Sequence, residues 1–304
     1  MLPTLKRAIN KLSSAPANEA ATGDQRSDLD TFVPPGHFYS PIPSLEEIKK
    51  DEEKIFGELP TAIPGLELHE QAQLELLETL IPYYNEMPFE ADKVKGLRYY
   101  YENPAYSYSD GIFLHCMIRH LKPKRIIEVG SGFSSCMILD TNDRFLDGAA
   151  KTTFIEPYPD LLLSLINDAD KDSVEVISTR LQDVDDAVFE RLEENDILFI
   201  DSTHVSKLNS DVNRIIFDIL PKLPAGVHVH FHDIFFPFEY PKKWAIEGRA
   251  WNEAYLLRAF LQYNSAFRIV LMNTYLEYFH RDFFEQNMPL CLKNLGGSIW
   301  IRKD

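Results

Sequence analysis

A glycine-containing turn follows a short apolar run in the middle of the chain, in RIIEVGSGFSS at residues 125–135. Glycine lets the backbone turn tightly and approach a ligand closely, because it carries no side chain. An apolar strand that leads into such a turn and then a helix is typical of sheets that bind ligands beyond their strands' carboxyl ends. The dinucleotide fingerprint requires a third glycine where Ser135 stands, so a nicotinamide dinucleotide is disfavoured.

An acidic residue, Glu156, ends the next apolar run in TTFIEPYP. A carboxylate at this point can accept hydrogen bonds from two ribose hydroxyls, as in the dinucleotide-binding folds. Its separation from the glycines is close to the ~20 residues expected of such folds. The alternative is a solvated glutamate at the end of a strand, but the apolar run before Glu156 and Pro157 after it favour a placed carboxylate.

Histidine and aspartate residues follow two later apolar runs, as Asp201 and His204 in IDSTH and as His232 and Asp233 in HFHD. Three histidines alternate in residues 227–233, so they share one face of a strand. The carboxyl ends of neighbouring parallel strands meet at one edge of a sheet. We therefore expect the two pairs to converge on one crevice, where a histidine with a pKa near neutrality could act as a base.

Short apolar strands alternate with amphipathic helices from residue 109 onward. This alternation predicts an α/β fold, with βαβ units and a doubly wound parallel sheet covered on both faces. We expect strands at 125–129, 152–155, 174–178, 197–200, 227–231, 267–272 and 298–302. The expected helices are 110–121, 135–145, 160–169, 185–194, 208–220 and 252–263.

The first 108 residues do not show this alternation of strands and helices. Residues 1–30 contain few large apolar side chains and are expected to form a flexible tail. Residues 31–108 are expected to form an N-terminal helical cap that includes a helix at 66–84. The cap begins with an aromatic strap at Phe32–Ile48, whose prolines exclude a helix up to Pro43. Ser44 with Glu47 resembles a capping box that opens a helix there. The predicted domains are therefore 1–30, 31–108 and 109–304.

The chain is acidic, with 47 acidic and 31 basic residues and a formal net charge of −16. A nucleic-acid partner is disfavoured, because its phosphates would be repelled. No apolar run has the length of a membrane span, and the first residues do not read as a secretory signal. Three widely spaced cysteines indicate neither a disulfide framework nor a cysteine zinc site. We expect a cytoplasmic protein with a small-molecule partner, no nucleic-acid or membrane partner, and homo-oligomerisation left open.

Together these segments resemble the class I S-adenosylmethionine (SAM)-dependent methyltransferases over residues 109–304. The E-x-G-x-G pattern at 128–132 is similar to the first motif of that family. The resemblance implies a Rossmann-like sheet of seven mostly parallel strands, the last two forming its antiparallel end, and SAM as cofactor. It assigns SAM binding to Glu128, Gly130, Ser131, Gly132, Glu156, Asp183 and Asp201. Asp183 would contact the adenine amino group, and capping of the helix at 185–194 is the alternative.

The I-D-S-x-H and H-F-H-D-I segments also resemble small-molecule methyltransferases near the antibiotic sugar O-methyltransferases. The resemblance implies O-methylation of a small molecule or a sugar-containing natural product. His232 is the first candidate for the catalytic base, with Asp233 beside it, and His204 is the second. Some members hold a divalent metal on strand-end acids, which here would be Asp201 and Asp233 with Mg²⁺. His232 replaces the first of the two acids common in metal users, so a metal-free reaction is the alternative.

Two other functions remain open at this stage. Other enzymes of this fold transfer the aminopropyl group of decarboxylated SAM, but the sequence shows no specific polyamine pocket. A non-catalytic scaffold would bind SAM or nothing, and the intact glycines, Glu156 and the two His/Asp pairs argue against it.

Overall fold

The computed structural model describes residues 32–304, so the predicted tail at 1–30 lies outside the described residues. Residues 45–304 form one compact unit, and the described residues 32–44 belong to another. In residues 32–44 the chain makes turns without a helix, as the prolines predict, and Phe32 and Phe38 are 88% and 89% exposed. None of the helices within 32–304 combines the length and apolarity needed to cross a membrane.

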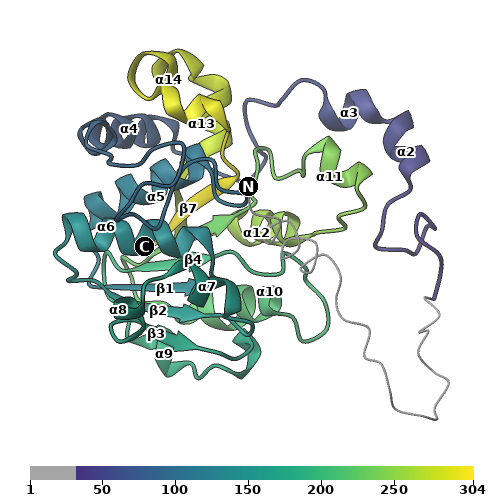
Figure 1. Ribbon diagram of the computed structural model, residues 1–304. Helices are drawn as coiled ribbons and strands as arrows, with labels where there is room; N and C mark the ends of the chain where they lie inside the picture. The colour runs from purple at the N-terminus through teal and green to yellow at the C-terminus, as the bar shows by residue number, and fades with distance from the viewer. Residues whose placement is uncertain (1–31) are drawn as a thin grey trace, which may run out of the picture. The chain divides into compact units, whose positions relative to one another are not determined.

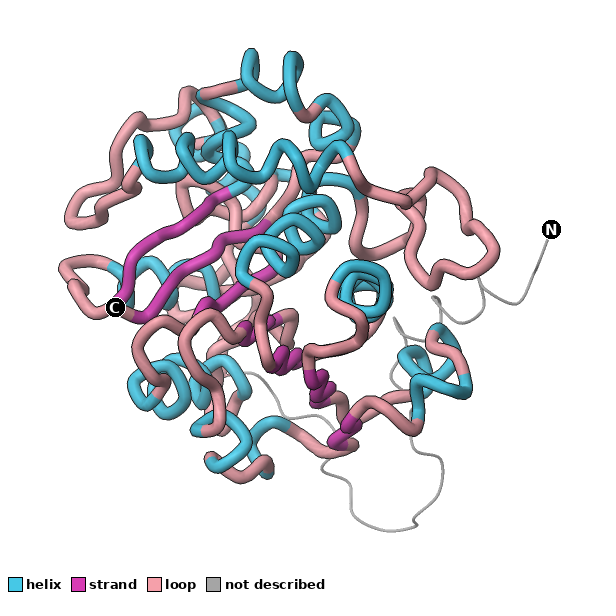
Figure 2. The backbone as a smooth tube through the Cα atoms, turned by 90° about the vertical axis from the view of Figure 1, so that its left-hand side faces the viewer, coloured by secondary structure: helices cyan, strands magenta, loops and turns pink. Residues whose placement is uncertain are grey.

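Seven strands form one sheet in the order β3-β2-β1-β4-β5-β7-β6, and Figure 2 shows them in a row with helices on both sides. β7 is antiparallel to β5 and β6, and the other pairs are parallel. The seven-stranded, mostly parallel fold predicted from the sequence is thus confirmed. The strands are β1 (Arg125–Val129), β2 (Lys151–Ile155), β3 (Glu175–Ile177), β4 (Ile197–Ile200), β5 (His228–His232), β6 (Phe267–Met272) and β7 (Ser298–Lys303).

The helices of this unit include several that are shorter than the periodicity predicted. The predicted helix at 160–169 is two helices, because Asn167 and Asp170 form a capping box that starts the second one. The helix predicted at 208–220 continues as a π-helix over Ile215–Ile219. The α-helices are α2 (Leu45–Lys50), α3 (Glu52–Phe56), α4 (Glu70–Asn85), α5 (Tyr108–Leu121), α6 (Phe133–Phe145), α7 (Asp160–Leu165), α8 (Asp168–Lys171), α9 (Ala187–Glu190), α10 (Asp211–Arg214), α11 (Lys242–Ile246), α12 (Glu253–Leu261), α13 (Asn273–Phe279) and α14 (Arg281–Asn287).

The chain order reverses between β1 and β4, and this switch point is where ligands bind in open α/β sheets. Val129 pairs with Ile200, and Ile200 pairs with Phe231. Because these pairs lie at or next to the strand ends, β1, β4 and β5 end at nearly the same level. The residues that follow the three strands therefore lie side by side at one edge of the sheet.

A buried arginine, Arg98, joins the segment before α5 to α6 and α8. Figure 1 shows α4, α5 and α6 side by side. The guanidinium of Arg98 binds Asp140 of α6 at 2.7 Å and also pairs with Asp170 of α8. Asp140 additionally accepts hydrogen bonds from the backbone N–H groups of Arg98 and Tyr99, both at 2.8 Å. The charge of Arg98 thus links three chain segments, which are its own segment, α6 and α8.

We predict that Arg98→Met destabilises the protein by about 3–5 kcal/mol, because it leaves two largely buried carboxylates without their cation. Urea unfolding measures the change. The matched control is Arg281→Met, whose exposed pair with Glu285 lies within one helix and should contribute little. Equal effects of the two substitutions would contradict this account of Arg98.

Candidate functional site

The turn after β1 contains two glycines with different structural requirements. Gly130 has φ +81°, and a Cβ there would lie 1.8 Å from the carbonyl oxygen of Asp201, so the fold itself demands glycine. Gly132 is extended, with φ −174°. A Cβ on Gly132 would make only an ordinary contact with Leu161, at 3.7 Å. The protein's own packing therefore explains the first glycine but not the second, which leaves open space beside the turn.

Glu128 lies beneath this turn and is fully buried. Its carboxylate accepts hydrogen bonds from the hydroxyls of Ser134, at 2.5 Å, and Ser135. The Ser135 hydroxyl in turn accepts a hydrogen bond from the Gly132 N–H at 3.0 Å. Burial raises the pKa of Glu128 to about 8, although the two serine hydroxyls oppose the shift. Glu128 thus supports the turn through groups of the protein itself.

Glu156 follows β2 and is held at the edge of the sheet by two backbone amides. Its carboxylate accepts hydrogen bonds from Ser131 N–H at 3.2 Å and Tyr158 N–H at 2.8 Å. The hydroxyls of Ser131 and Ser202 are buried and have no hydrogen-bond partner among the described residues. Buried hydroxyls without a partner are costly, so these two are available to a polar ligand.

Asp183 lies farther out, in a 3₁₀ turn at Leu181–Asp183 after β3. It is exposed and forms an ion pair with Arg180 at 2.8 Å. The capping position of α9 is occupied by Asp186, not by Asp183. The alternative of a helix cap at Asp183 is therefore not realised.

The two histidine–aspartate pairs that the sequence places after β4 and β5 lie together. His204 Nε2 is 3.3 Å from Asp201 Oδ1 and 3.5 Å from Asp233 Oδ2. His232 Nε2 is 3.4 Å from Asp233 Oδ1. Both His204 and Asp233 have a backbone φ of +58°, in the left-handed region that few residues other than glycine adopt. Such conformations are concentrated at functional sites, where the surrounding structure maintains them.

Glu253 and Trp251 complete this cluster, and sequence reasoning did not identify either as contacting His204. Glu253 is buried at the start of α12, and its Oε2 lies 2.8 Å from His204 Nδ1. The Trp251 ring packs against the His204 ring, with centroids 4.4 Å apart. The His204 carbonyl accepts hydrogen bonds from the N–H groups of Asn252 and Glu253, both at 3.1 Å. The sequence offers one signal near them, the insertion after β5 at residues 236–251, which contains Trp244 and Trp251.

Opposite charges alternate in the cluster. Burial disfavours a charged His204, but Asp201 and Glu253 outweigh it and raise the pKa of this histidine well above its ordinary value. Burial also opposes charge on His232, whose pKa is nevertheless raised by Asp233 and Asp201. The pKa of Asp201 is lowered, against the effect of burial, by His232 and His204. Burial dominates at Asp233 and Glu253 and raises the pKa of both carboxyls.

The other histidines of β5 belong to the core. His230 is fully buried, stacks on Phe199 with centroids 4.1 Å apart, and has no hydrogen-bond partner at either ring nitrogen among the described residues. Burial lowers the pKa of His230 well below its ordinary value and that of His228 to about 4. Both are therefore neutral at pH 7, and only the last histidine of the strand reaches the cluster.

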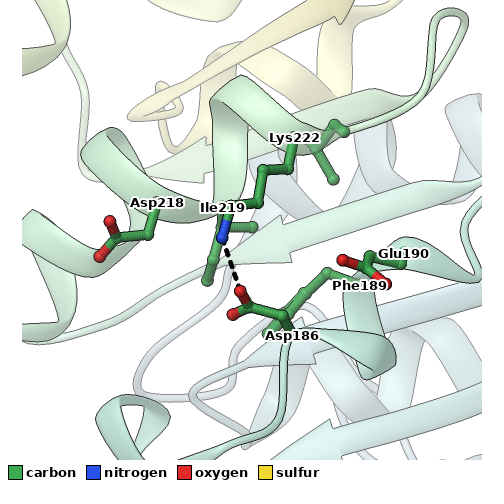
Figure 3. Close-up of a pocket in the computed structure, with 7 residues that line it drawn as sticks. Asp186, Phe189, Glu190, Asp218, Ile219 and Lys222 are labelled. Carbon is green, nitrogen blue, oxygen red and sulfur yellow. Dashed lines mark hydrogen bonds and ion pairs between the residues drawn. The ribbon is translucent and has the colours of Figure 1, made fainter.

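A small hollow elsewhere on the unit is not the site. Figure 3 shows Asp186, Phe189 and Lys222 among the residues around it. Asp186 and Lys222 form an ion pair with an N–O distance of 2.6 Å. Its volume of about 10 Å³ has room for a single water at most. None of the residues that the sequence analysis singled out lies there.

We predict that Glu128→Gln changes how stability depends on pH. The pKa of Glu128 is raised from 4.5 to about 8, so the folded state keeps a proton that the unfolded chain releases. This stabilisation is complete below about pH 4.5 and is lost as the pH rises through about 8. Urea unfolding between about pH 5 and 8 should show wild type losing stability relative to Glu128→Gln. Parallel curves would contradict the prediction, and Glu190→Gln, at an exposed position, is the control.

Comparison with known proteins identifies one domain in the chain. Residues 127–234 match the family described as a methyltransferase domain. An uncharacterized protein of Archaeoglobus fulgidus is 38% identical over 172 residues, which cover 55% of this chain and 77% of that protein.

Two solved structures are similar at low identity. The SAH-bound methyltransferase PaMTH1 of Podospora anserina is 16% identical with a TM-score of 0.44, covering 86% of this chain and 96% of its own. The SAM complex of the O-methyltransferase TomG of Streptomyces achromogenes, involved in tomaymycin synthesis, is 16% identical with a TM-score of 0.43, covering 66% and 83%.

The matched segment begins within β1 and ends just after β5, so it contains both the glycine turn and the histidine–aspartate cluster. The chain therefore contains a methyltransferase domain, set in a seven-stranded and mostly parallel sheet.

Proposed function

We propose that this enzyme methylates a hydroxyl group of a small molecule, with a sugar-containing natural product as one acceptor class. The observation that carries the proposal is the histidine–aspartate cluster next to the glycine turn. The two features meet at Asp201, whose carbonyl contacts Gly130 and whose carboxylate faces His204. A hydroxyl is a weak nucleophile until it loses its proton, so a base beside the methyl donor favours O-methylation.

The proposed SAM site uses the turn after β1 and the acids that follow β2, β3 and β4. SAM supplies a methyl group that is already activated on a sulfonium. The open space at Gly132 and the unpaired hydroxyls of Ser131 and Ser202 fit a polar ligand there. Glu156 would accept hydrogen bonds from the ribose hydroxyls, because each of its oxygens has only one amide partner.

The remaining predicted SAM residues take different places in this proposal. Glu128 would act from beneath, by holding the serines that shape the turn. Gly130 would bring the turn close to Asp201. Asp183 would reach the adenine only by exchanging its ion pair with Arg180.

His232 remains our first choice for the proton acceptor, through Nε2. It closes β5, and its Nε2 lies within 3.4 Å of Asp233 Oδ1, which can orient the ring and stabilise its charge. The other ring nitrogen is buried without a partner among the described residues, so Nε2 is the atom that faces the cluster. His204 is the second choice, because its Nδ1 is already engaged by Glu253.

Aromatic side chains of the insertion after β5 form a wall beside the cluster. Trp251 contacts His204 on one side, and its ring lies 5.2 Å from that of Trp244 on the other. Arg249 covers Trp244 with its guanidinium 4.4 Å from the ring centre. We propose that this wall limits water at the site and favours a compact acceptor with an apolar face.

We predict that Gly132→Val and Glu156→Ala weaken binding of S-adenosylhomocysteine (SAH), measured by titration calorimetry. A branched side chain at 132 would occupy the space proposed for the ligand. Loss of the Glu156 carboxylate removes charge-assisted hydrogen bonds, which corresponds to about 10–100-fold in affinity. Wild-type affinity in both variants would refute this cofactor site. Glu190→Ala, at an exposed acid on α9, is the control.

We further predict that His232→Ala lowers turnover by ~10²–10⁴-fold while SAH affinity stays within a few-fold of wild type. Incubation with methyl-labelled SAM and a panel of hydroxyl compounds identifies the acceptor, and product analysis separates methyl from aminopropyl transfer. His204→Ala is measured in parallel, with the exposed His69→Ala as control. If neither His232→Ala nor His204→Ala loses more than a few-fold, these histidines do not supply the base.

A further inference from the structure

Arg249 lies on the aromatic wall with most of its hydrogen-bonding capacity unused. Its guanidinium carbon is 4.4 Å from the ring centre of Trp244 and 5.2 Å from that of Trp251. Its Nε donates to Glu247 at 3.2 Å, and its two terminal nitrogens make no hydrogen bond within residues 32–304. The side chain is 39% exposed. A guanidinium that stacks on aromatic rings keeps the N–H groups along its edge available for a planar anion.

The end of α11 determines where Arg249 lies. The helix ends in a Schellman motif, in which Gly248 has φ +81° and its N–H donates to the Ala245 carbonyl at 3.2 Å. The N–H of Arg249 donates to the Trp244 carbonyl at 3.0 Å. Glycine permits this turn because it adopts positive φ without a steric cost. The two hydrogen bonds turn the chain back over the helix, so the guanidinium is positioned on Trp244 before any ligand binds.

The charge of Arg249 is close to the histidine–aspartate cluster but is not neutralised by it. Trp251 links the two, since its ring packs on Arg249 and also lies 4.4 Å from the ring of His204. Burial raises the pKa of Asp233, and the positive charge of Arg249 is among the effects that oppose this rise. Among the described residues, however, Arg249 forms no ion pair with a carboxylate of the cluster. Its charge therefore remains available to a ligand that binds there.

From this geometry we propose that Arg249 binds a carboxylate group of the acceptor and so directs the acceptor hydroxyl toward the histidine–aspartate cluster. The inference rests on the proposed function, because it names the acceptor class of the same site. Arginine binds a carboxylate through two parallel N–H···O hydrogen bonds, which fix the direction of the bound group as well as its position. An acceptor with a carboxylate at one end and a hydroxyl at the other would lie along Trp251.

The charges around Arg249 favour a carboxylate over a phosphate. The other two basic residues of the insertion after β5 already have acidic partners, since Lys242 pairs with Glu52 at 2.5 Å and Lys243 with Glu247 at 3.8 Å. Arg249 therefore offers a single positive charge. A phosphate monoester carries ~1.5–2 negative charges at pH 7, so the acids of the cluster would repel it more strongly than they repel a carboxylate.

The experiment measures binding of small probes to the full chain, with and without SAH, through the change in tryptophan fluorescence. Trp244 and Trp251 line the proposed site, whereas the third tryptophan, Trp300, is fully buried in β7. The probes are 4-hydroxybenzoate, its neutral analogue 4-hydroxybenzamide, and phenyl phosphate.

We expect saturable binding of 4-hydroxybenzoate that is at least ~10-fold tighter than binding of the amide, because only the carboxylate makes charge-assisted hydrogen bonds. Phenyl phosphate should also bind more weakly than 4-hydroxybenzoate. Equal affinity for 4-hydroxybenzoate and the amide, or no saturable binding of 4-hydroxybenzoate, would overturn the inference. Tighter binding of phenyl phosphate would reject a carboxylate as the group that Arg249 binds.

Variants then test whether the preference for a carboxylate comes from Arg249. Arg249→Gln removes the charge, so 4-hydroxybenzoate should bind about 10–100-fold more weakly. Arg249→Lys keeps the charge but loses the paired N–H groups, so it should restore only part of the affinity. The matched control is Arg281→Gln, because Arg281 also pairs with a glutamate through Nε, at 2.9 Å, but lies on α14. Wild-type affinity for 4-hydroxybenzoate in Arg249→Gln would reject the assignment.

SAH titration and methyl transfer separate this inference from the proposed function. SAH affinity within a few-fold of wild type shows that a variant is folded, and should Arg249→Gln not fold, Arg249→Lys gives the same comparison. A wild-type protein that selects 4-hydroxybenzoate through Arg249 but methylates no hydroxyl compound would support the inference and refute the proposed function. Methylation of neutral hydroxyl compounds, with no preference for carboxylate probes, would support the proposed function and refute the inference.

Discussion

The parallel pairing of β1, β4 and β5, with their carboxyl ends at nearly one level, is the constraint on which the site depends. It places the turn after β1 against the first residue after β4 so closely that only glycine is tolerated at 130. The same alignment sets Asp201 beside the end of β5, where His232 and Asp233 follow. A shift of one residue in the register would turn alternate side chains to the other face and separate the cluster. The positions of the cluster residues therefore depend first on how these strands are aligned.

The sequence was sufficient for the features that depend on local pattern. Apolar runs of four to six residues predicted β1, β4 and β6 with the observed bounds, because strands buried on both faces must be apolar throughout. It also predicted that Asp201, His204, His232 and Asp233 would meet, since that follows from parallel topology alone. Helix bounds were less predictable, because apolar periodicity does not register a local capping box such as Asn167 with Asp170, or the π-helix at Ile215–Ile219.

Contacts between distant segments could not be predicted in this way. Glu253 is 49 residues from His204, and Arg98 is 42 residues from Asp140, and neither spacing carries a periodic signal. In the sequence, Glu253 looks like an ordinary charged residue of an amphipathic helix, and Arg98 looks like an ordinary charged residue beside tyrosines. Only burial distinguishes them, because a buried charge must find an opposite charge or a hydrogen bond. The distinction between Gly130 and Gly132 is likewise invisible in the motif, since it depends on what each Cβ would meet.

The cost of burying so many ionisable groups explains how the fold is arranged around the cluster. Three carboxylates and two histidines lie within contact of one another, and each charge alone would be destabilising in this environment. Their alternation in sign reduces the cost, but it also requires that the ring of His204 keep one orientation. The left-handed backbone at His204 provides part of that restraint, and Trp251 and Glu253 add to it from a segment beyond the matched methyltransferase domain. The segment after β5 thus helps to hold the cluster in place, and the matched residues 127–234 do not contain every residue that contacts it.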